Sequence, residues 1–259
     1  MRTFGIVNWQ GLYTLTAKEI GRFMKVHAQT ISAPVVTALL YYLVFSVAMG
    51  DHPSGVEGVG FLQFIAPGLI MMTIAQNAFA NTSSSLVIAK VQGSIVDLLM
   101  PPLSAGELIT GFTVGGIARG LVVGVASAVT LMLLIHMPIH DWFYVMFHAV
   151  FGGAMLALVG IIGGIWSDKF DQMAMVQNFI VMPLTFLSGT FFSARQLPEQ
   201  WQFLCHANPI FYMIDGFRYG FVGAGDSNLH TGVVVVLLTD LVLLVVAYAM
   251  FRTGYKLKS

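Results

Sequence analysis

The chain has 259 residues, of which 57% are hydrophobic and 9% are charged, and its formal net charge is zero. Soluble domains carry about 25% charged residues, so a chain with so few charges cannot cover a water-facing surface and fits a lipid environment instead. The zero net charge gives no sign of a nucleic-acid partner. The single cysteine, Cys205, excludes an intramolecular disulfide, and we expect no metal site.

The first predicted element is a helix over residues 8–28. Its apolar positions recur at helical spacing against the charged residues Lys18, Glu19, Arg22 and Lys25. This pattern predicts an amphipathic helix lying at the cytoplasmic interface of a membrane, either as a plain anchor or with a mechanical role. The same charges interrupt the apolar core that a signal peptide would need, so we expect the chain to reach its membrane through its own spans.

Six apolar stretches follow, each long enough to cross a bilayer core of about 30 Å, which takes roughly 20 residues. They are Thr30–Met49, Phe61–Thr82, Ile109–Ile135, Trp142–Trp166, Ala174–Phe192 and Thr231–Phe251. The sequence therefore predicts an all-α membrane protein in which residues 1–259 form a single transmembrane domain with six transmembrane helices.

Basic residues predict the orientation of these spans. One side is flanked by nine Lys and Arg residues, namely Arg2, Lys18, Arg22, Lys25, Lys90, Lys169, Arg252, Lys256 and Lys258. The other side has only Arg195 and Arg218. Because basic residues accumulate in cytoplasmic connections, both termini are expected in the cytoplasm, which requires an even number of spans.

The region before the last span, residues 194–228, could be mistaken for a seventh crossing. It contains several charged residues, and Pro198 and Pro209 interrupt it. A further crossing would also place the basic C-terminal tail outside. We therefore expect two short re-entrant helices that lie in the outer leaflet or dip into it.

The connection between the second and third spans contains an apolar cytoplasmic segment, residues 84–100. It carries Lys90 and Asp97 as its only charged residues, and Pro101 and Pro102 end it. A water-facing helix this apolar needs a surface to cover, either in the protein's own bundle or on a partner subunit.

Polar residues form a stripe along one face of the second predicted span: Thr73, Gln76, Asn77, Asn81 and Ser84. In lipid, such a face must point at other helices or at a polar pathway. Hydrogen bonding between helices and lining of a pathway are both open at this point.

Two opposite charges fall at similar depth within the predicted spans, Arg119 in the third and Asp240 in the sixth. Each lies about 15 Å from the cytoplasmic end of its span at 1.5 Å rise per residue. Because an unpaired charge at this depth is costly, we predict an ion pair between them. Direct contact of either residue with substrate or water is the alternative.

The sequence gives no sign of chemistry on this chain. No Gly-Lys dipeptide occurs, which excludes a Walker A phosphate loop. The spans hold neither paired carboxylates nor a nucleophile with an adjacent base. We expect the chain not to be catalytic on its own and to carry no cofactor, so any ATP must be hydrolysed by another polypeptide.

An ordered motif occupies residues 183–218. It consists of Pro183, Leu187, Ser188, Gly189, Phe192, Leu197, Pro198, Asn208, Pro209, Tyr212, Asp215 and Arg218. In order and spacing this motif resembles the permease subunit of type-2 ATP-binding-cassette exporters. Residues 93–108 resemble the cytoplasmic coupling segment of that family, with Asp97 where the family commonly has Glu. The predicted spans, termini and entry helix extend the resemblance over essentially the whole chain.

The resemblance implies a subunit of the bacterial inner membrane that exports an amphiphilic or glycan-type substrate. It would pair with a second copy, as a homodimer, or with a close homologue. Two copies of a cytoplasmic ATPase subunit would carry the ATP and Mg and would dock on the coupling segment. A secondary transporter or channel that works without an ATPase is the alternative.

The resemblance also implies two sets of site residues. Docking of the ATPase is expected at Val87, Lys90, Val91, Gly93, Ile95, Asp97 and Leu98, with Val91, Ile95 and Leu98 as apolar anchors. The translocation pathway is expected between protomers, where the first and fifth spans meet, near Tyr41, Tyr42, Phe45, Thr73, Asn77, Asn81, Thr185 and Ser188.

Overall fold

The computed structural model describes residues 7–50, 54–56 and 58–257. Their regular elements are the helices α1 (Trp9–Met24), α2 (His27–Met49), α3 (Phe61–Val91), α4 (Ile95–Leu99), α5 (Ala105–Met132), α6 (Trp142–Trp166), α7 (Phe170–Val176), the π-helix η1 (Gln177–Val181), α8 (Met182–Phe186), the 3-10 turn η2 (Ala194–Gln196), α9 (Glu199–Ala207), α10 (Pro209–Val222) and α11 (Leu229–Thr253). The all-helical class predicted from the sequence is confirmed.

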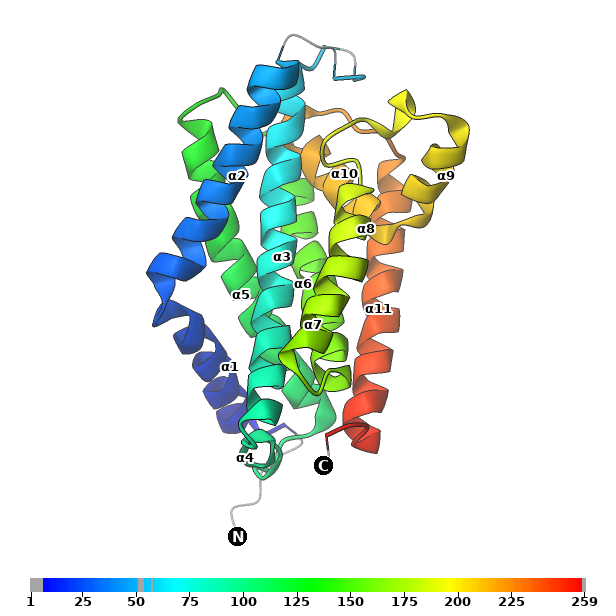
Figure 1. The fold of residues 1–259 in the computed structure, drawn as a ribbon. Coiled ribbons are helices and arrows are strands. Elements are labelled where there is room, and N and C mark those ends of the chain that lie inside the picture. The colour runs from blue at the N-terminus through cyan, green and yellow to red at the C-terminus, as the bar shows by residue number, and fades with distance from the viewer. Residues whose placement is uncertain (1–6, 51–53, 57, 258–259) are drawn as a thin grey trace.

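Helix α3 forms the centre of the bundle and packs against α2, α5, α6 and α10 (Figure 1). Small residues allow this close packing. A Cβ atom added at Gly120 of α5 would lie 2.7 Å from the carbonyl oxygen of Ile74, and one added at Gly160 of α6 would lie 2.6 Å from that of Phe79. Glycine at these contacts lets the helix backbones approach each other, as is usual for helices that associate in lipid.

Within the described residues, five helices are long and apolar enough to cross a membrane, namely α2, α3, α5, α6 and α11. The fifth predicted span is instead a chain of three short segments, α7, η1 and α8, which together cover residues 170–186. The three segments are contiguous, and Pro183 explains the departure from a regular α-helix, because proline has no amide hydrogen and its ring clashes with the preceding turn. A π-helical turn directly before this proline accommodates it.

Helix α3 is longer than the predicted second span, which was expected to end at Thr82. It continues to Val91, so the predicted break at Ser83 lies inside the helix. The serines there do not end it, because their hydroxyls have helix or tertiary partners. Ser84 donates to the carbonyl oxygen of Ala80 at 2.5 Å, and Ser85 donates to the Glu19 carboxylate at 2.7 Å.

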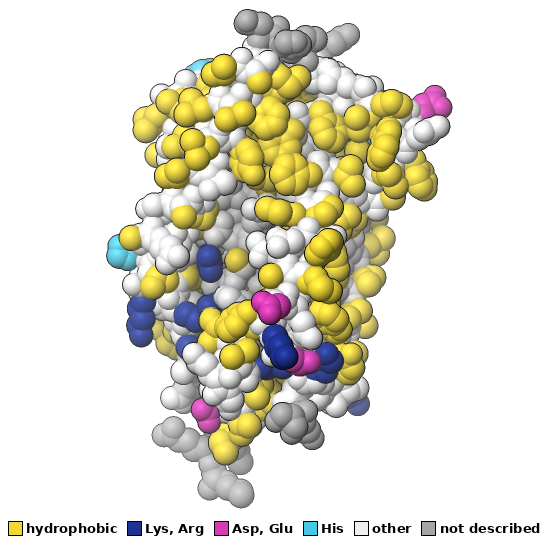
Figure 2. Space-filling model, viewed as in Figure 1, with side chains coloured by type: hydrophobic (Ala, Val, Ile, Leu, Met, Phe, Trp, Pro, Cys, Tyr) yellow, Lys and Arg dark blue, Asp and Glu magenta, His cyan; other side chains and the backbone are white. Residues whose placement is uncertain are grey.

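The start of α1 and the end of α11 lie at the same end of the bundle, which we call the basal end (Figure 1). The short helices α9 and α10 lie at the opposite, distal end. On the face shown in Figure 2, Lys and Arg side chains gather in the half toward the basal end, whereas the half toward the distal end is mostly hydrophobic. This distribution agrees with the count of basic residues along the sequence.

Candidate functional site

The basal end presents α4, the helix that follows α3 after a turn at Gly93, whose φ of +72° favours glycine. Asp97 is exposed there and lines a cavity of about 310 Å³ between α1 and the segment that follows α4. The apolar residues of this end divide into an inward and an outward set. The inward set anchors the segment to the bundle, and the outward set is available to a partner.

The predicted docking anchors belong mainly to the inward set. Ile95 and Leu98 are buried in a core cluster formed with α5, α6 and α11, and Val87 is fully buried in α3. Of the three predicted anchors only Val91 is exposed, at 49%. The placement of Ile95 and Leu98 on a partner-facing surface is therefore wrong, because the helix uses them to cover its own bundle.

The outward set forms an apolar surface of which the sequence analysis identified only Val91 as an anchor. Val91, Val96, Leu99 and Met100 are all exposed, Met100 at 75%. We call these four residues the basal apolar surface. An exposed group of large apolar side chains at a charged, water-facing end of a protein is typical of an interaction site.

Lys90 connects the end of α3 to the loop after α6, and its ammonium group is hydrogen-bonded within the protein. Its ammonium group donates to the carbonyl oxygens of Ile165 and Ser167, each at 2.8 Å, and to the Asp168 carboxylate at 2.7 Å. Lys256 donates to the same carboxylate at 3.0 Å. These hydrogen bonds hold the pKa of Asp168 below its ordinary value, with the bond from Lys90 as the largest cause.

A groove of about 270 Å³ lies between α2, α3 and the π-helix η1. Its polar lining residues are Thr37, Thr73, Gln76, Asn77 and Gln177. The structure thus places two of the predicted pathway residues, Thr73 and Asn77, in one groove with a residue of the segmented helix. Asn77 also accepts a hydrogen bond from Arg119 at 3.3 Å, so the polar stripe serves both as an interhelical contact and as a groove lining.

The other predicted pathway residues are placed elsewhere. Tyr42 is in the core at 4% exposure. Thr185 and Ser188 are also buried; the Thr185 hydroxyl donates to the carbonyl oxygen of Val181, and the Ser188 hydroxyl donates to that of Thr185. Tyr41 and Phe45 instead contact the ring of Phe191, Phe45 in a stacked arrangement with centroids 4.8 Å apart.

Asn81 belongs to a polar cluster between α1 and α3 that the sequence did not reveal. Arg22 donates to the backbone carbonyl of Asn81 at 2.6 Å and to its side-chain oxygen at 3.0 Å. Arg22 also pairs with Glu19 at 3.2 Å, and Glu19 is fully buried. Helix α1 therefore turns two of its charged residues inward, unlike the simple amphipathic surface helix that was predicted.

The predicted ion pair between Arg119 and Asp240 is not formed. Arg119 donates to Asn77, and within the described part of the chain neither carboxylate oxygen of Asp240 has a hydrogen-bond partner. Asp240 lines a different space, between α5, α6 and α11. The two residues face different neighbours: Arg119 contacts Asn77 of α3, whereas Asp240 faces the space between α5, α6 and α11.

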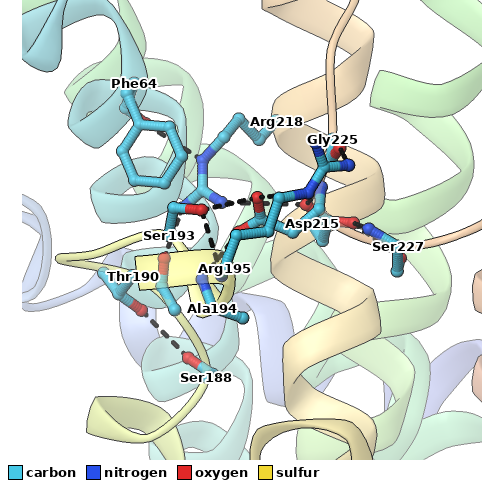
Figure 3. A network of polar contacts seen from close by, with 12 residues as sticks. Phe64, Ser188, Thr190, Ser193, Ala194, Arg195, Asp215, Arg218, Gly225 and Ser227 are labelled. Atoms are coloured by element: carbon cyan, nitrogen blue, oxygen red, sulfur yellow. Dashed lines mark hydrogen bonds and ion pairs between the residues drawn. The ribbon is translucent and has the colours of Figure 1, made fainter. Parts of the chain in front are cut away.

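At the distal end, three of the motif residues meet in one buried network (Figure 3). Arg218 projects from α10 and donates to the carbonyl oxygens of Phe64 at 3.0 Å and of Gly189 at 2.6 Å. Its guanidinium also lies 3.8 Å from the carboxylate of Asp215. Gly189 has a φ of +71°, which a residue with a side chain rarely adopts, so the turn after α8 depends on it.

Asp215 connects this network to the loop that leads into α11. Its carboxylate accepts from the backbone amides of Asp226 and Ser227, both at 2.8 Å, and from the Ser227 hydroxyl at 2.6 Å. Asn208 accepts from the amide of Ile210, so that it caps α10 at the turn before Pro209, and it donates to the carbonyl oxygen of Leu184 at 2.6 Å. Pro183, another motif residue, is exposed on α8. The motif thus fixes how α8, α10 and the start of α3 meet.

The bundle of long apolar helices, with a buried network at its distal end and an apolar helix at its basal end, has the architecture of an integral membrane protein. The sequence profile of the ABC-2 type transporter family matches residues 10–222, and the chain belongs to that family. It is 39% identical over 253 residues to the inner membrane transport permease YadH of Escherichia coli K12, covering 97% of this chain and 98% of that protein.

More distant similarity extends to nodulation proteins. The chain is 22% identical over 236 residues to nodulation protein J of Rhizobium leguminosarum bv. viciae, which covers 90% of each chain. It is 20% identical over 231 residues to nodulation protein J of Neorhizobium galegae, covering 88% of this chain and 87% of that protein. The similarity to YadH and the apolar helices together support an integral protein of the inner membrane.

Proposed function

We propose that this chain is the transmembrane subunit of an ATP-driven exporter that moves an amphiphilic or glycan-type substrate out of the cytoplasm. The basal apolar surface carries the proposal. Family membership implies an ATP-binding-cassette partner, and exposed Val91, Val96, Leu99 and Met100 supply a surface for a soluble ATPase at the end where the basic residues gather. With this docking, both termini lie on the cytoplasmic side, and two ATPase copies bind the ATP and Mg.

Six crossings fit this orientation, with the segmented helix of α7, η1 and α8 as the fifth. Its residues 170–186 are close to the lower limit of roughly 17 residues for a span. In this arrangement α9 and α10 are re-entrant helices at the outer leaflet, held by the network around Arg218.

The passage is proposed to lie between two copies of the chain. The supporting observation is the polar groove between α2, α3 and η1, because polar side chains on a membrane helix face must point at protein or at water. Gln76 and Gln177 lie in this groove, one on each wall. A second copy placed against α2 and η1 would enclose the groove and complete a pathway.

Co-purification tests the ATPase partner. The chain is extracted from its native membrane in mild detergent, and we expect a soluble ATPase to be recovered with it. Val96→Asp and Met100→Asp should each abolish that recovery without unfolding the permease, because both side chains are exposed. Ala17→Asp, at an exposed position of α1 near the same end, is the matched control and should leave recovery unchanged.

The alternative of a channel or secondary transporter predicts a different result. In that case no ATPase accompanies the chain, and the charged substitutions do not change its interactions. Recovery of the same ATPase with both Val96→Asp and Met100→Asp would show that docking occurs elsewhere.

Crosslinking tests the dimer. Single cysteines at Thr37 and Gln177, in a chain with Cys205→Ser, should form a bond between two copies. A cysteine at Ala157, a fully buried position of α6, should not. Crosslinks confined to α5 or α11 would contradict the proposed arrangement of the passage.

A further inference from the structure

A second cavity, separate from the polar groove, lies at the level of the membrane between α5, α6 and α11. It has a volume of about 350 Å³. Its lining is mostly apolar and consists of Ile109, Thr110, Thr113, Val114, Phe151, Ala154, Leu158, Leu237, Asp240, Leu241 and Leu244. Ligand pockets in proteins range upward from about 300 Å³, so this space suits a small ligand or a single alkyl chain.

Asp240 is the charged residue of this cavity, and it lies near the middle of α11. Both of its carboxylate oxygens are shielded from solvent, and neither has a hydrogen-bond partner among residues 7–50, 54–56 and 58–257. Asp240 also takes part in none of the ion pairs formed among those residues. Buried polar groups without a partner are rare in folded proteins and call for an explanation such as a missing ligand.

Thr113 provides an independent observation on the opposite wall. Other threonines in the long helices donate their hydroxyl to the carbonyl one turn earlier, as Thr110 does to Gly106 at 2.8 Å and Thr239 does to Val235 at 2.8 Å. The Thr113 hydroxyl is buried and makes no such bond within the described chain. One unsatisfied acceptor group and one unsatisfied hydroxyl therefore line the same cavity.

We propose that this cavity binds a hydrophobic amine, with the ammonium group on Asp240 and Thr113 and the apolar body against the leucines of α11. The two carboxylate oxygens of Asp240 can only accept hydrogen bonds, and an ammonium group supplies both hydrogen-bond donors and a compensating positive charge. Phe151 also lines the cavity, and an aromatic ring is a group that attracts a cation. The cavity and the polar groove have no lining residue in common, so this proposal rests on the cavity alone and not on the proposed export function.

Photolabelling tests the site. The purified chain is placed in phosphatidylcholine nanodiscs and exposed to dodecylamine that carries a diazirine in its chain. A second probe has the same chain with a hydroxyl in place of the amine. We expect the amine probe to label peptides of α5 and α11 about tenfold more than the alcohol probe. Equal labelling by the two probes would overturn the proposal.

Variants then assign the labelling to the cavity. Asp240→Asn should lower labelling by the amine about tenfold, and Thr113→Val should lower it less. Ala154→Phe fills the space and leaves the carboxylate in place, so it tests the same site if Asp240→Asn does not fold. Asp97→Asn removes an exposed carboxylate and is the matched control. Unchanged labelling in a folded Asp240→Asn or Ala154→Phe variant would refute the site.

Competition experiments distinguish a free single-chain amine from the amine of a lipid headgroup. Free dodecylamine should reduce labelling if the cavity takes a single-chain amine, which its volume favours. If replacement of phosphatidylcholine by phosphatidylethanolamine reduces labelling equally, the same site takes the amine of a lipid headgroup. If neither reduces labelling, the probe has reacted outside a binding site and the proposal is wrong.

Discussion

The guanidinium carbon of Arg218 lies 3.7 Å from the centre of the Phe64 ring. Arg218 belongs to α10 and Phe64 to the first turn of α3, so this contact joins two elements that are far apart in the sequence. The same guanidinium donates to the carbonyl oxygens of Phe64 and Gly189 and faces Asp215. A single buried cation thus fixes the distal end of three chain segments.

The first prediction concerns this cation. Arg218→Met should lower the free energy of unfolding by about 3–5 kcal/mol, because it leaves the buried Asp215 carboxylate without its cation. Arg218→Lys should also destabilise, since one ammonium group cannot reproduce the two carbonyl bonds and the ring contact. The measurement is the apparent midpoint of thermal unfolding in detergent.

Arg195→Met is the matched control for this prediction. Its side chain is 61% exposed, at the edge of the same network, where it pairs with Asp226 at 3.7 Å. Only the arginine of this pair is exposed, and the Asp226 carboxylate is fully buried. That carboxylate keeps hydrogen bonds from the Ser193 hydroxyl and the Ala194 amide, so Arg195→Met should destabilise less than Arg218→Met. Equal losses for Arg195→Met and Arg218→Met would show that burial of the cation does not determine the effect.

The second prediction concerns pH and the Asp168 carboxylate. Its pKa is lowered from 3.8 by the hydrogen bonds from Lys90 and Lys256. A lowered carboxyl pKa contributes stability that is fully present above the unfolded value and is lost as the pH falls through the folded value. The difference in thermal midpoint between wild type and Asp168→Asn should therefore be constant at neutral pH and shrink below 3.8.

Salt provides the control for the second prediction. Asp168 is half exposed, so the difference in thermal midpoint between wild type and Asp168→Asn is small at neutral pH. It should decrease further as salt is added, because salt screens exposed charges. A difference for Asp168→Asn that persists unchanged to about pH 3 would contradict the assigned role of the two lysines.

The third prediction concerns the contact between α3 and α6. Gly160→Ala would place a methyl group 2.6 Å from the carbonyl oxygen of Phe79, so the two helices must separate. Overpacking of this kind costs about 1–3 kcal/mol, which should appear as a lower thermal midpoint. At Gly21 of α1 an added methyl group meets nothing within 4 Å, so Gly21→Ala should be neutral or stabilising. If both substitutions act alike, the close approach at Gly160 is not required.

Hydrophobicity and length predicted the long helices well, because a helix that crosses a membrane needs a long uninterrupted stretch of apolar residues. The predicted span Trp142–Trp166 coincides with α6. Side-chain direction was harder to predict. Helix α4 has five residues, too few for a pattern that could show Ile95 and Leu98 turned inward. For Arg119 and Asp240, depth gives one coordinate only, and the rotation of each helix about its axis determines whether they meet.

The charged face of α1 shows the same limit and leads to the last prediction. Glu19 and Arg22 looked like solvent-facing residues, yet Glu19 is fully buried and accepts from Ser85 at 2.7 Å and from Arg22 at 3.2 Å. The side chain of Arg22 remains 29% exposed and keeps its bonds to Asn81 when Glu19 is changed. The two single substitutions should therefore be unequal.

Arg22→Met should cost about 3–5 kcal/mol, because it leaves a fully buried carboxylate without a cation. Glu19→Gln should cost only about 1–2 kcal/mol, since the amide still bonds to Ser85 and Arg22 still reaches water and Asn81. The double variant should lose less than the sum, with a coupling of about 0.5–3 kcal/mol measured by unfolding in detergent. Lys18→Met, at an exposed neighbour on α1, should change stability by no more than about 0.5 kcal/mol. Strictly additive losses, or a larger loss for Glu19→Gln than for Arg22→Met, would show that the pair does not hold α1 to α3.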